Sequence, residues 1–134
     1  MKKIHRDNRG FTLIEIMIVV AIIGLIASLI MPNLLGRYER SKEEITKAQV
    51  EMLSTSIQAF IVDTGRCPTA MSELIAPQDA KDTKWRGPYL SKKELPIDAW
   101  NREYQYKCPG ENGPFDLYSL GPNNKLDERA IKNW

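Results

Sequence analysis

An apolar run near the start of the chain constrains the fold more than any other feature. Residues 16–31 contain no charged side chain, and the apolar segment extends on both sides to cover residues 11–35. As a helix, this segment is long enough to cross a hydrocarbon core of about 30 Å. Its one acid is Glu15, and a carboxylate costs roughly 2.5–3.5 kcal/mol at the bilayer centre. We therefore expect a membrane helix in which Glu15 has a function.

A short basic leader precedes this run. Its charged residues are Lys2, Lys3, Arg6, Arg9 and Asp7. Positively charged flanks stay on the cytoplasmic side, so the chain after residue 35 is expected to lie outside. Residues 28–32 make a poor cleavage site for an ordinary secretory signal. The glycine at the border between polar and apolar sequence is Gly10, before the run.

The six residues at this border, Gly-Phe-Thr-Leu-Ile-Glu from Gly10 to Glu15, resemble the prepilin signature of type IV pilins and type II secretion pseudopilins. The resemblance implies cleavage between Gly10 and Phe11 by a prepilin peptidase, and N-methylation of Phe11. It also implies that the apolar helix is held in membrane lipid before assembly and later forms the core of a fibre. We hypothesise that Glu15 pairs with the Phe11 amine of the adjacent subunit; the alternative is a carboxylate that only snorkels to the headgroups.

Gly24 and Pro32 interrupt the membrane half of the helix. Gly24 lowers helix propensity, and Pro32 removes the hydrogen bond to the carbonyl of Ser28. From the residues alone, a mild kink explains both, as is common in membrane helices. The resemblance favours a second interpretation, in which residues 24–32 stretch when subunits leave the bilayer and pack into a fibre.

The composition argues against catalysis and against nucleic-acid binding. The only histidine is His5, in the leader, so the cleaved chain has none for Ser-His-Asp or Cys-His catalysis or for metal binding. The net charge of +2 reflects the basic leader, and the remainder has no basic excess to suggest a nucleic-acid partner. At 134 residues, the chain is one small domain plus an anchor, and we expect no enzyme.

The expected fold is α+β and pilin-like, with a long N-terminal helix packed on a small antiparallel β-sheet. Residues 37–62 carry apolar side chains at three- and four-residue steps, which predicts an amphipathic continuation of the apolar helix. The residues of this stripe are Ile45, Ala48, Met52, Leu53, Ile57, Phe60 and Ile61. We expect this stripe to pack on the chain's own sheet; the alternative is a groove for a partner helix. Gly65 is the expected left-handed cap. Residues 104–107 and 115–120 predict strands, and 72–75 a short helix capped by Thr69 or Ser72.

The globular part resembles the major pseudopilin of type II secretion more than a type IV pilin. The resemblance rests on residues 85–90, 98–101, Tyr104, 109–110, 116–121 and 133–134. Their aromatic residues, including Trp85 and Trp100, are expected to fill the core. Asn101 replaces a glycine of the family, and asparagine tolerates left-handed backbone angles.

The family builds a calcium site in the loop after its Ser-Leu-Gly strand, and here the chain departs from it. The loop at 122–129 is shorter and poorer in acid. Candidate ligands are the Leu120 carbonyl, Asn123 and Asp127, but Lys125 stands close by and opposes a cation. We therefore expect the loop to close without calcium through Asx-type turns, and we expect no cofactor. Weak calcium binding through Asn123 and Asp127 is the alternative.

Cys67 and Cys108 are the chain's two cysteines. The predicted topology places both thiols in an oxidising periplasm, where disulfides persist. A small domain that buries little core also benefits from a crosslink. We expect a disulfide between them; two buried free thiols are the alternative.

The resemblance as a whole implies a structural subunit of a type II secretion pseudopilus, a periplasmic fibre that drives export of folded proteins through the outer membrane. The implied organisation is a cleaved leader at 1–10, a transmembrane and fibre-core helix at 11–35, and a periplasmic domain at 36–134. Before assembly the chain would cross the bacterial inner membrane once. Its partners would be further copies, minor pseudopilins, the prepilin peptidase and an inner-membrane assembly platform. Alternatives are a type IV pilin or competence pseudopilin and, less favoured, a membrane-tethered binding module or enzyme.

Overall fold

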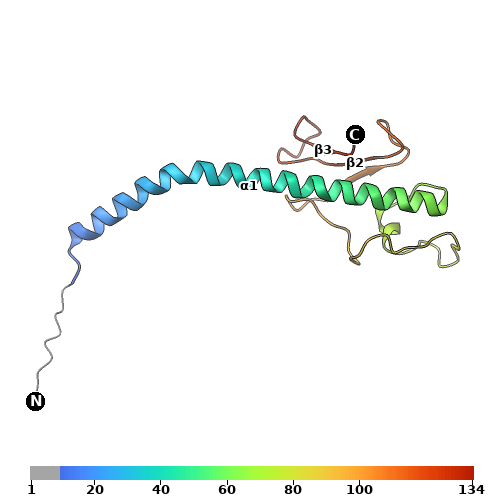
Figure 1. Cartoon of the computed structure of the whole chain (residues 1–134), viewed down its shortest axis with the longest axis horizontal. Coiled ribbons are helices and arrows are strands. Elements are labelled where there is room, and N and C mark those ends of the chain that lie inside the picture. The colour runs from blue at the N-terminus through green and yellow to red at the C-terminus, as the bar shows by residue number, and fades with distance from the viewer. Residues whose placement is uncertain (1–9) are drawn as a thin grey trace, which may run out of the picture. The chain divides into compact units, whose positions relative to one another are not determined.

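The computed structural model describes residues 10–134, and Figure 1 shows their helices and strands. In chain order, the elements are α1 (Leu13–Thr64), the 3₁₀ helix η1 (Met71–Leu74), β1 (Gln105–Lys107), β2 (Asp116–Ser119) and β3 (Ile131–Lys132). The chain divides into two compact units, Met1–Tyr38 and Glu39–Trp134. The predictions made for the leader, including His5, fall on residues 1–9 and lie outside the described residues.

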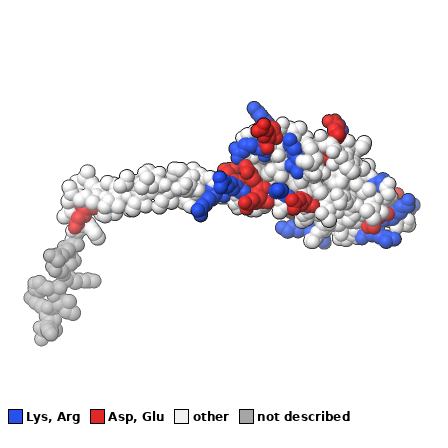
Figure 2. Space-filling view, turned by 45° about the horizontal axis from the view of Figure 1, so that its top comes forward, with Lys and Arg blue, Asp and Glu red and all other residues white. Residues whose placement is uncertain are grey.

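In the first unit, α1 is an apolar helix that the chain itself leaves uncovered. Between residues 11 and 35, the large apolar side chains are 49% to 84% exposed. An 18-residue window of the helix reaches a mean hydropathy of 2.9, which is apolar enough to cross a membrane. Figure 2 shows this stretch as almost free of charge. An apolar surface of this size requires lipid or protein to cover it.

In the second unit, one face of α1 packs on the core of the globular domain. Val50, Leu53, Ile57 and Phe60 are at most 2% exposed, at three- and four-residue steps along the helix. They pack against a second set of buried residues, which comprises Leu74, Leu90, Tyr104, Phe115 and Leu117. The prediction that the stripe packs on the chain's own domain is confirmed.

The predicted stripe was too broad. Ile45 and Met52 were counted in it, yet they are 52% and 48% exposed. The buried line follows Thr46, Val50 and Leu53, so both residues lie at its margin, where the sheet and loops do not reach. Apolar spacing alone does not show how wide a surface the partner element covers.

The sheet is antiparallel in the order β1-β2-β3, as the α+β prediction requires. Gln105 pairs with Tyr118, and Ser119 pairs with Ile131. The predicted strands at 104–107 and 115–120 match β1 and β2 to within one residue at each end. Sequence reasoning missed β3, because a two-residue strand has no alternation to detect. Figure 1 shows β2 and β3 alongside the later turns of α1.

The end of α1 follows the predicted cap. Gly65 has a φ of +73°, and its N–H donates to the carbonyl of Ile61 at 2.8 Å. The hydroxyl of Thr64 donates to the carbonyl of Phe60 at 2.7 Å. Left-handed geometry at this position is what glycine supplies without steric cost.

A buried carboxylate organises the segment after α1, and sequence reasoning did not find it. Glu73 is fully buried and accepts hydrogen bonds from Arg66 at 2.7 Å and from the Thr69 backbone N–H at 2.7 Å. The predicted cap of η1 was wrong: its N-cap is Ala70, without a side-chain hydrogen bond, because Thr69 bonds to Glu73 instead. Burial alone would raise the pKa of Glu73, but the bonds from Arg66 and Thr69 outweigh it and lower that pKa below its ordinary value.

Glu73→Gln should therefore lower the free energy of unfolding by about 1–3 kcal/mol at neutral pH. The lowered pKa means that the ionised form contributes stability above the ordinary glutamate pKa, and this contribution is lost as pH falls through the folded-state pKa. Chemical unfolding at several pH values measures this, and the difference from wild type should shrink in acid. Glu111→Gln is the matched control, because the Lys107–Glu111 pair is exposed at both ends and its loss should change stability little. Equal losses in the two variants would contradict the assigned role.

The structure contains the Cys67–Cys108 disulfide, with a Cα–Cα distance of 6.2 Å. The two cysteines are 41 residues apart, and the bridge ties the segment after α1 to the end of β1. This Cα–Cα distance is ordinary for a disulfide.

Removing this bridge should destabilise the domain strongly. Closing a loop of this length contributes about 4 kcal/mol on the chain-entropy model. The variant with both Cys67→Ser and Cys108→Ser should melt about 10 °C or more below wild type. Its melting temperature should not respond to dithiothreitol, whereas that of wild type should fall. Two alkylatable thiols in protein purified without reductant would contradict the bridge.

Candidate functional site

The candidate site is the junction at the start of α1, where the polar leader meets the apolar helix. Gly10 and Phe11 lie before the first helical residue, and Phe11 is 84% exposed. A Cβ added at Gly10 would meet no described heavy atom within 4 Å. Within the described residues, the Gly10–Phe11 peptide is therefore open to an approaching protein.

Glu15 closes a capping box at this junction. Its carboxylate accepts a hydrogen bond from the backbone N–H of Thr12 at 2.8 Å and another from the Thr12 hydroxyl at 3.1 Å. In return, the Glu15 N–H donates to the Thr12 hydroxyl oxygen at 3.2 Å. The two residues satisfy otherwise unpaired N–H groups of the first turn, and the negative charge lies at the positive end of the helix dipole.

Sequence reasoning selected Glu15 but missed Thr12. The signal was present, because Thr-x-x-Glu before an apolar run is the sequence pattern of a capping box. The predicted pairing of Glu15 with the Phe11 amine joins two chains and stays a prediction.

Gly24 and Pro32 lie inside α1, which is continuous through both. A Cβ at Gly24 would meet nothing within 4 Å among the described residues, so packing within this chain does not require a glycine there. The predicted stretching of residues 24–32 concerns the fibre and stays a prediction.

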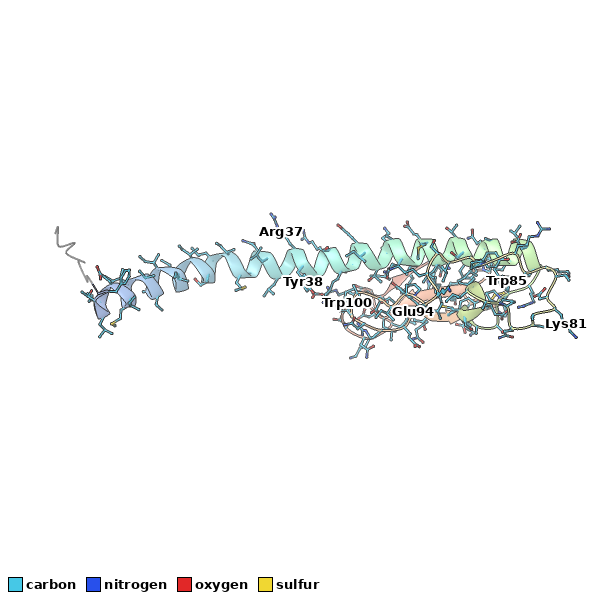
Figure 3. The ribbon with its side chains drawn as sticks, turned by 90° about the horizontal axis from the view of Figure 1, so that it is seen from below. Arg37, Tyr38, Lys81, Trp85, Glu94 and Trp100 are labelled. Atoms are coloured by element: carbon cyan, nitrogen blue, oxygen red, sulfur yellow. A yellow bond between two sulfur atoms is a disulfide. The ribbon has the colours of Figure 1, made fainter. Side chains whose placement is uncertain are left out.

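Within the 98–101 block, Asp98 is buried and connects several elements. Asp98 is 3% exposed and accepts hydrogen bonds from the Ser119 hydroxyl at 2.6 Å and the Arg102 N–H at 2.9 Å. Asn101 has a φ of +61°, as predicted for the residue that replaces a glycine. The indole of Trp100, labelled in Figure 3, donates to Glu39 of α1 at 3.3 Å. The block therefore joins β2 to the helix.

The loop between β2 and β3 brings two of the candidate calcium ligands together. The Asn123 amide donates to Asp127 at 2.9 Å, and the other Asp127 oxygen accepts the Arg129 N–H at 2.8 Å in an Asx-type turn. These bonds, that of Asn123 foremost, lower the pKa of Asp127. The carbonyl of the third candidate, Leu120, accepts the Lys125 N–H at 3.3 Å. Among residues 10–134, no three His, Cys, Asp or Glu side chains cluster to hold a metal ion.

Comparisons with known proteins agree with this geometry. Residues 33–134 match the family model described as type II secretion system (T2SS), protein G, and residues 5–31 match the prokaryotic N-terminal methylation motif. Similar relatives include the type II secretion system core protein G of Pseudomonas aeruginosa, 35% identical over 97% of both chains. That of Escherichia coli K12 is 35% identical over 95% of this chain and 91% of its own.

A solved structure is similar as well. It is the crystal structure of the major pseudopilin from the type 2 secretion system of enterohaemorrhagic Escherichia coli. The TM-score is 0.60 at 25% sequence identity, and the match covers 77% of this chain and 95% of that one. The family match, the relatives and the shared fold lead to one conclusion: this chain belongs to the type II secretion system protein G family, the major pseudopilins.

Proposed function

We propose that this chain is a fibre-forming subunit of a type II secretion pseudopilus, with a mechanical role in export. One observation carries the proposal: an uncovered apolar helix begins at a prepilin-type junction and ends in a small globular domain. Such a helix can be stored in a bilayer and later buried among the helices of other copies. Subunits added at the base would extend a periplasmic fibre and push folded substrates toward the outer-membrane channel.

The proposed route begins with the chain crossing the inner membrane once, with its N-terminus in the cytoplasm. A prepilin peptidase cuts after Gly10, and Phe11 is methylated at its new amine. An assembly platform in the inner membrane then moves the subunit from lipid into a fibre of further copies and minor pseudopilins. The match of residues 5–31 to the prokaryotic N-terminal methylation motif and the exposed apolar helix support this route.

One groove of the globular domain bears on the enzyme alternative. A groove of about 450 Å³ beside η1 has Glu103 as its only acid and includes Tyr104 and Tyr106 in its lining. Burial raises the pKa of Tyr106 to about 12 and that of Tyr104 further above its ordinary value, so both phenols stay protonated near neutral pH. This groove offers no paired base and nucleophile of the kind that hydrolytic sites use.

Secretion assays and electron microscopy together test the proposal. A strain lacking this chain should retain in its periplasm the proteins it normally exports, and the wild-type gene should restore export. Overproduction should yield regular filaments in sheared surface or periplasmic material. Normal secretion with a loss of surface pili would favour the pilin alternative. A full-length protein that stays monomeric while restoring secretion would contradict the fibre role.

A further inference from the structure

The loop between β2 and β3 is already closed by hydrogen bonds at the atoms where the family resemblance places calcium. The carbonyl of Leu120 accepts the Lys125 N–H at 3.3 Å. Both carboxylate oxygens of Asp127 are used, one by the Asn123 amide at 2.9 Å and one by the Arg129 N–H at 2.8 Å. Calcium takes six to eight oxygen ligands, whereas the loop's candidate residues offer few oxygens, and the Leu120 and Asp127 oxygens already accept hydrogen bonds within the loop. The residues present do not fit the ion.

Asn123 is the residue that removes the need for a cation. Its amide group supplies a donor to the Asp127 carboxylate, where an aspartate would supply only a second acceptor. Two carboxylates at that distance repel each other unless a positive charge lies between them. An amide and a carboxylate bridge the same gap directly.

Arg102 provides a fixed positive charge at the start of the loop. Its guanidinium donates to the carbonyl of Gly121, lies 3.8 Å from the carboxylate of Asp98, and rests over the Trp100 ring at 5.8 Å. The side chain is only 26% exposed, so solvent screens it less than a surface lysine. The guanidinium of Arg102 therefore donates a charged hydrogen bond to a backbone carbonyl at the start of the loop.

Arg129 provides a second positive charge at the end of the loop. Its guanidinium donates to Glu43 of α1 at 2.7 Å. Gly121 and Arg129 also meet through the backbone, because a Cβ at Gly121 would lie 2.3 Å from the Arg129 carbonyl oxygen. Arg102 thus contacts the start of the loop at Gly121, and Arg129 joins the end of the loop to Glu43 of α1.

We propose that this chain closes the loop between β2 and β3 with its own side chains in place of calcium. Asn123 bridges to Asp127, while Arg102 and Arg129 supply the positive charge at the two ends. The domain then keeps its fold in surroundings where calcium is scarce. The proposal does not depend on the role in secretion, because it concerns only how the domain is held.

Thermal melting of the full-length protein in detergent micelles tests the proposal, with EDTA compared against millimolar calcium. The wild-type midpoint should move by less than about 2 °C between the two conditions. Asn123→Asp should melt about 4–8 °C below wild type in EDTA, because it places a second carboxylate against Asp127. Asn124→Asp is the matched control: it adds the same charge one residue along, at a side chain without an assigned bond to Asp127, and should melt close to wild type.

A second variant separates the role of the charge from that of the amide. Arg102→Gln removes the positive charge, and its shorter side chain also withdraws the donor from the Gly121 carbonyl, so it should lower the midpoint in EDTA by several degrees. A calcium-induced rise of several degrees in wild type would overturn the proposal, since it would mean that the loop still binds the ion. Equal melting of Asn123→Asp and Asn124→Asp in EDTA would overturn it as well.

Discussion

Replacing Gly10 with leucine should leave an uncut precursor in the membrane, with the product of mature size absent. The side chain would enter open space in the chain itself, because no described atom lies within 4 Å of a Cβ at this position. The substitution therefore meets no packing among the described residues, and we expect its effect to arise in the site of the peptidase. That enzyme has to hold an extended backbone at the membrane face, and a bulky side chain next to the cut peptide obstructs it.

Gel mobility and intact mass measure the result. Wild type should lose residues 1–10 and carry one methyl group on the amine of Phe11. Gly36→Leu is the matched control, because a Cβ there also meets nothing within 4 Å while the residue lies far from the cut. This control should be processed fully. Mature-sized protein from Gly10→Leu, or an unmethylated wild-type terminus, would contradict the proposed processing.

Features that depend on a residue and its near neighbours in the chain were the ones best predicted from the sequence. The apolar helix, the Gly65 cap and the left-handed Asn101 each depend on a residue and its immediate neighbours, and the structure has all three. The strands β1 and β2 were also predicted, because a Pro-Gly turn lies between two short runs that contain aromatic residues.

The features that the sequence did not predict depend on partners distant in the chain. Glu73 is an ordinary surface acid by pattern, and only the folded chain brings Arg66 and Thr69 to its carboxylate. The strand β3 exists because β2 offers it an edge. Ile45 was predicted to lie in the apolar stripe and Val50 was not, yet the folded domain buries Val50 and leaves Ile45 half exposed. The spacing of apolar residues shows which face of the helix is buried, but the size of the element packed against it decides how many of those residues are covered.

Glu15 poses a different problem, because one carboxylate has two candidate partners. In the single chain it bonds to Thr12 and caps its own helix. In a fibre, the hypothesis gives it the Phe11 amine of an adjacent subunit. A capping box accepts glutamine in place of glutamate, whereas an ion pair does not. Charge and hydrogen bonding can therefore be separated at this one position.

Glu15→Ala should be cut and methylated normally yet yield few fibres. The carboxylate lies four residues beyond the Phe11 amine, and in the apolar fibre core its charge would set the register of neighbouring helices. Loss of an interaction of about 1.4 kcal/mol for each added subunit corresponds to a tenfold weaker association. We therefore expect fibre yield in sheared material to fall at least about tenfold, measured by electron microscopy and by immunoblotting.

Glu15→Gln decides between the two partners. Glutamine keeps an oxygen that can accept from the Thr12 N–H, so the capping box survives, but the charge is gone. If the amine of another subunit is the partner that matters, Glu15→Gln should assemble as poorly as Glu15→Ala. Wild-type yield from Glu15→Gln would assign the residue to helix capping alone. Wild-type yield from Glu15→Ala would remove both roles and leave a carboxylate that only reaches toward the lipid headgroups.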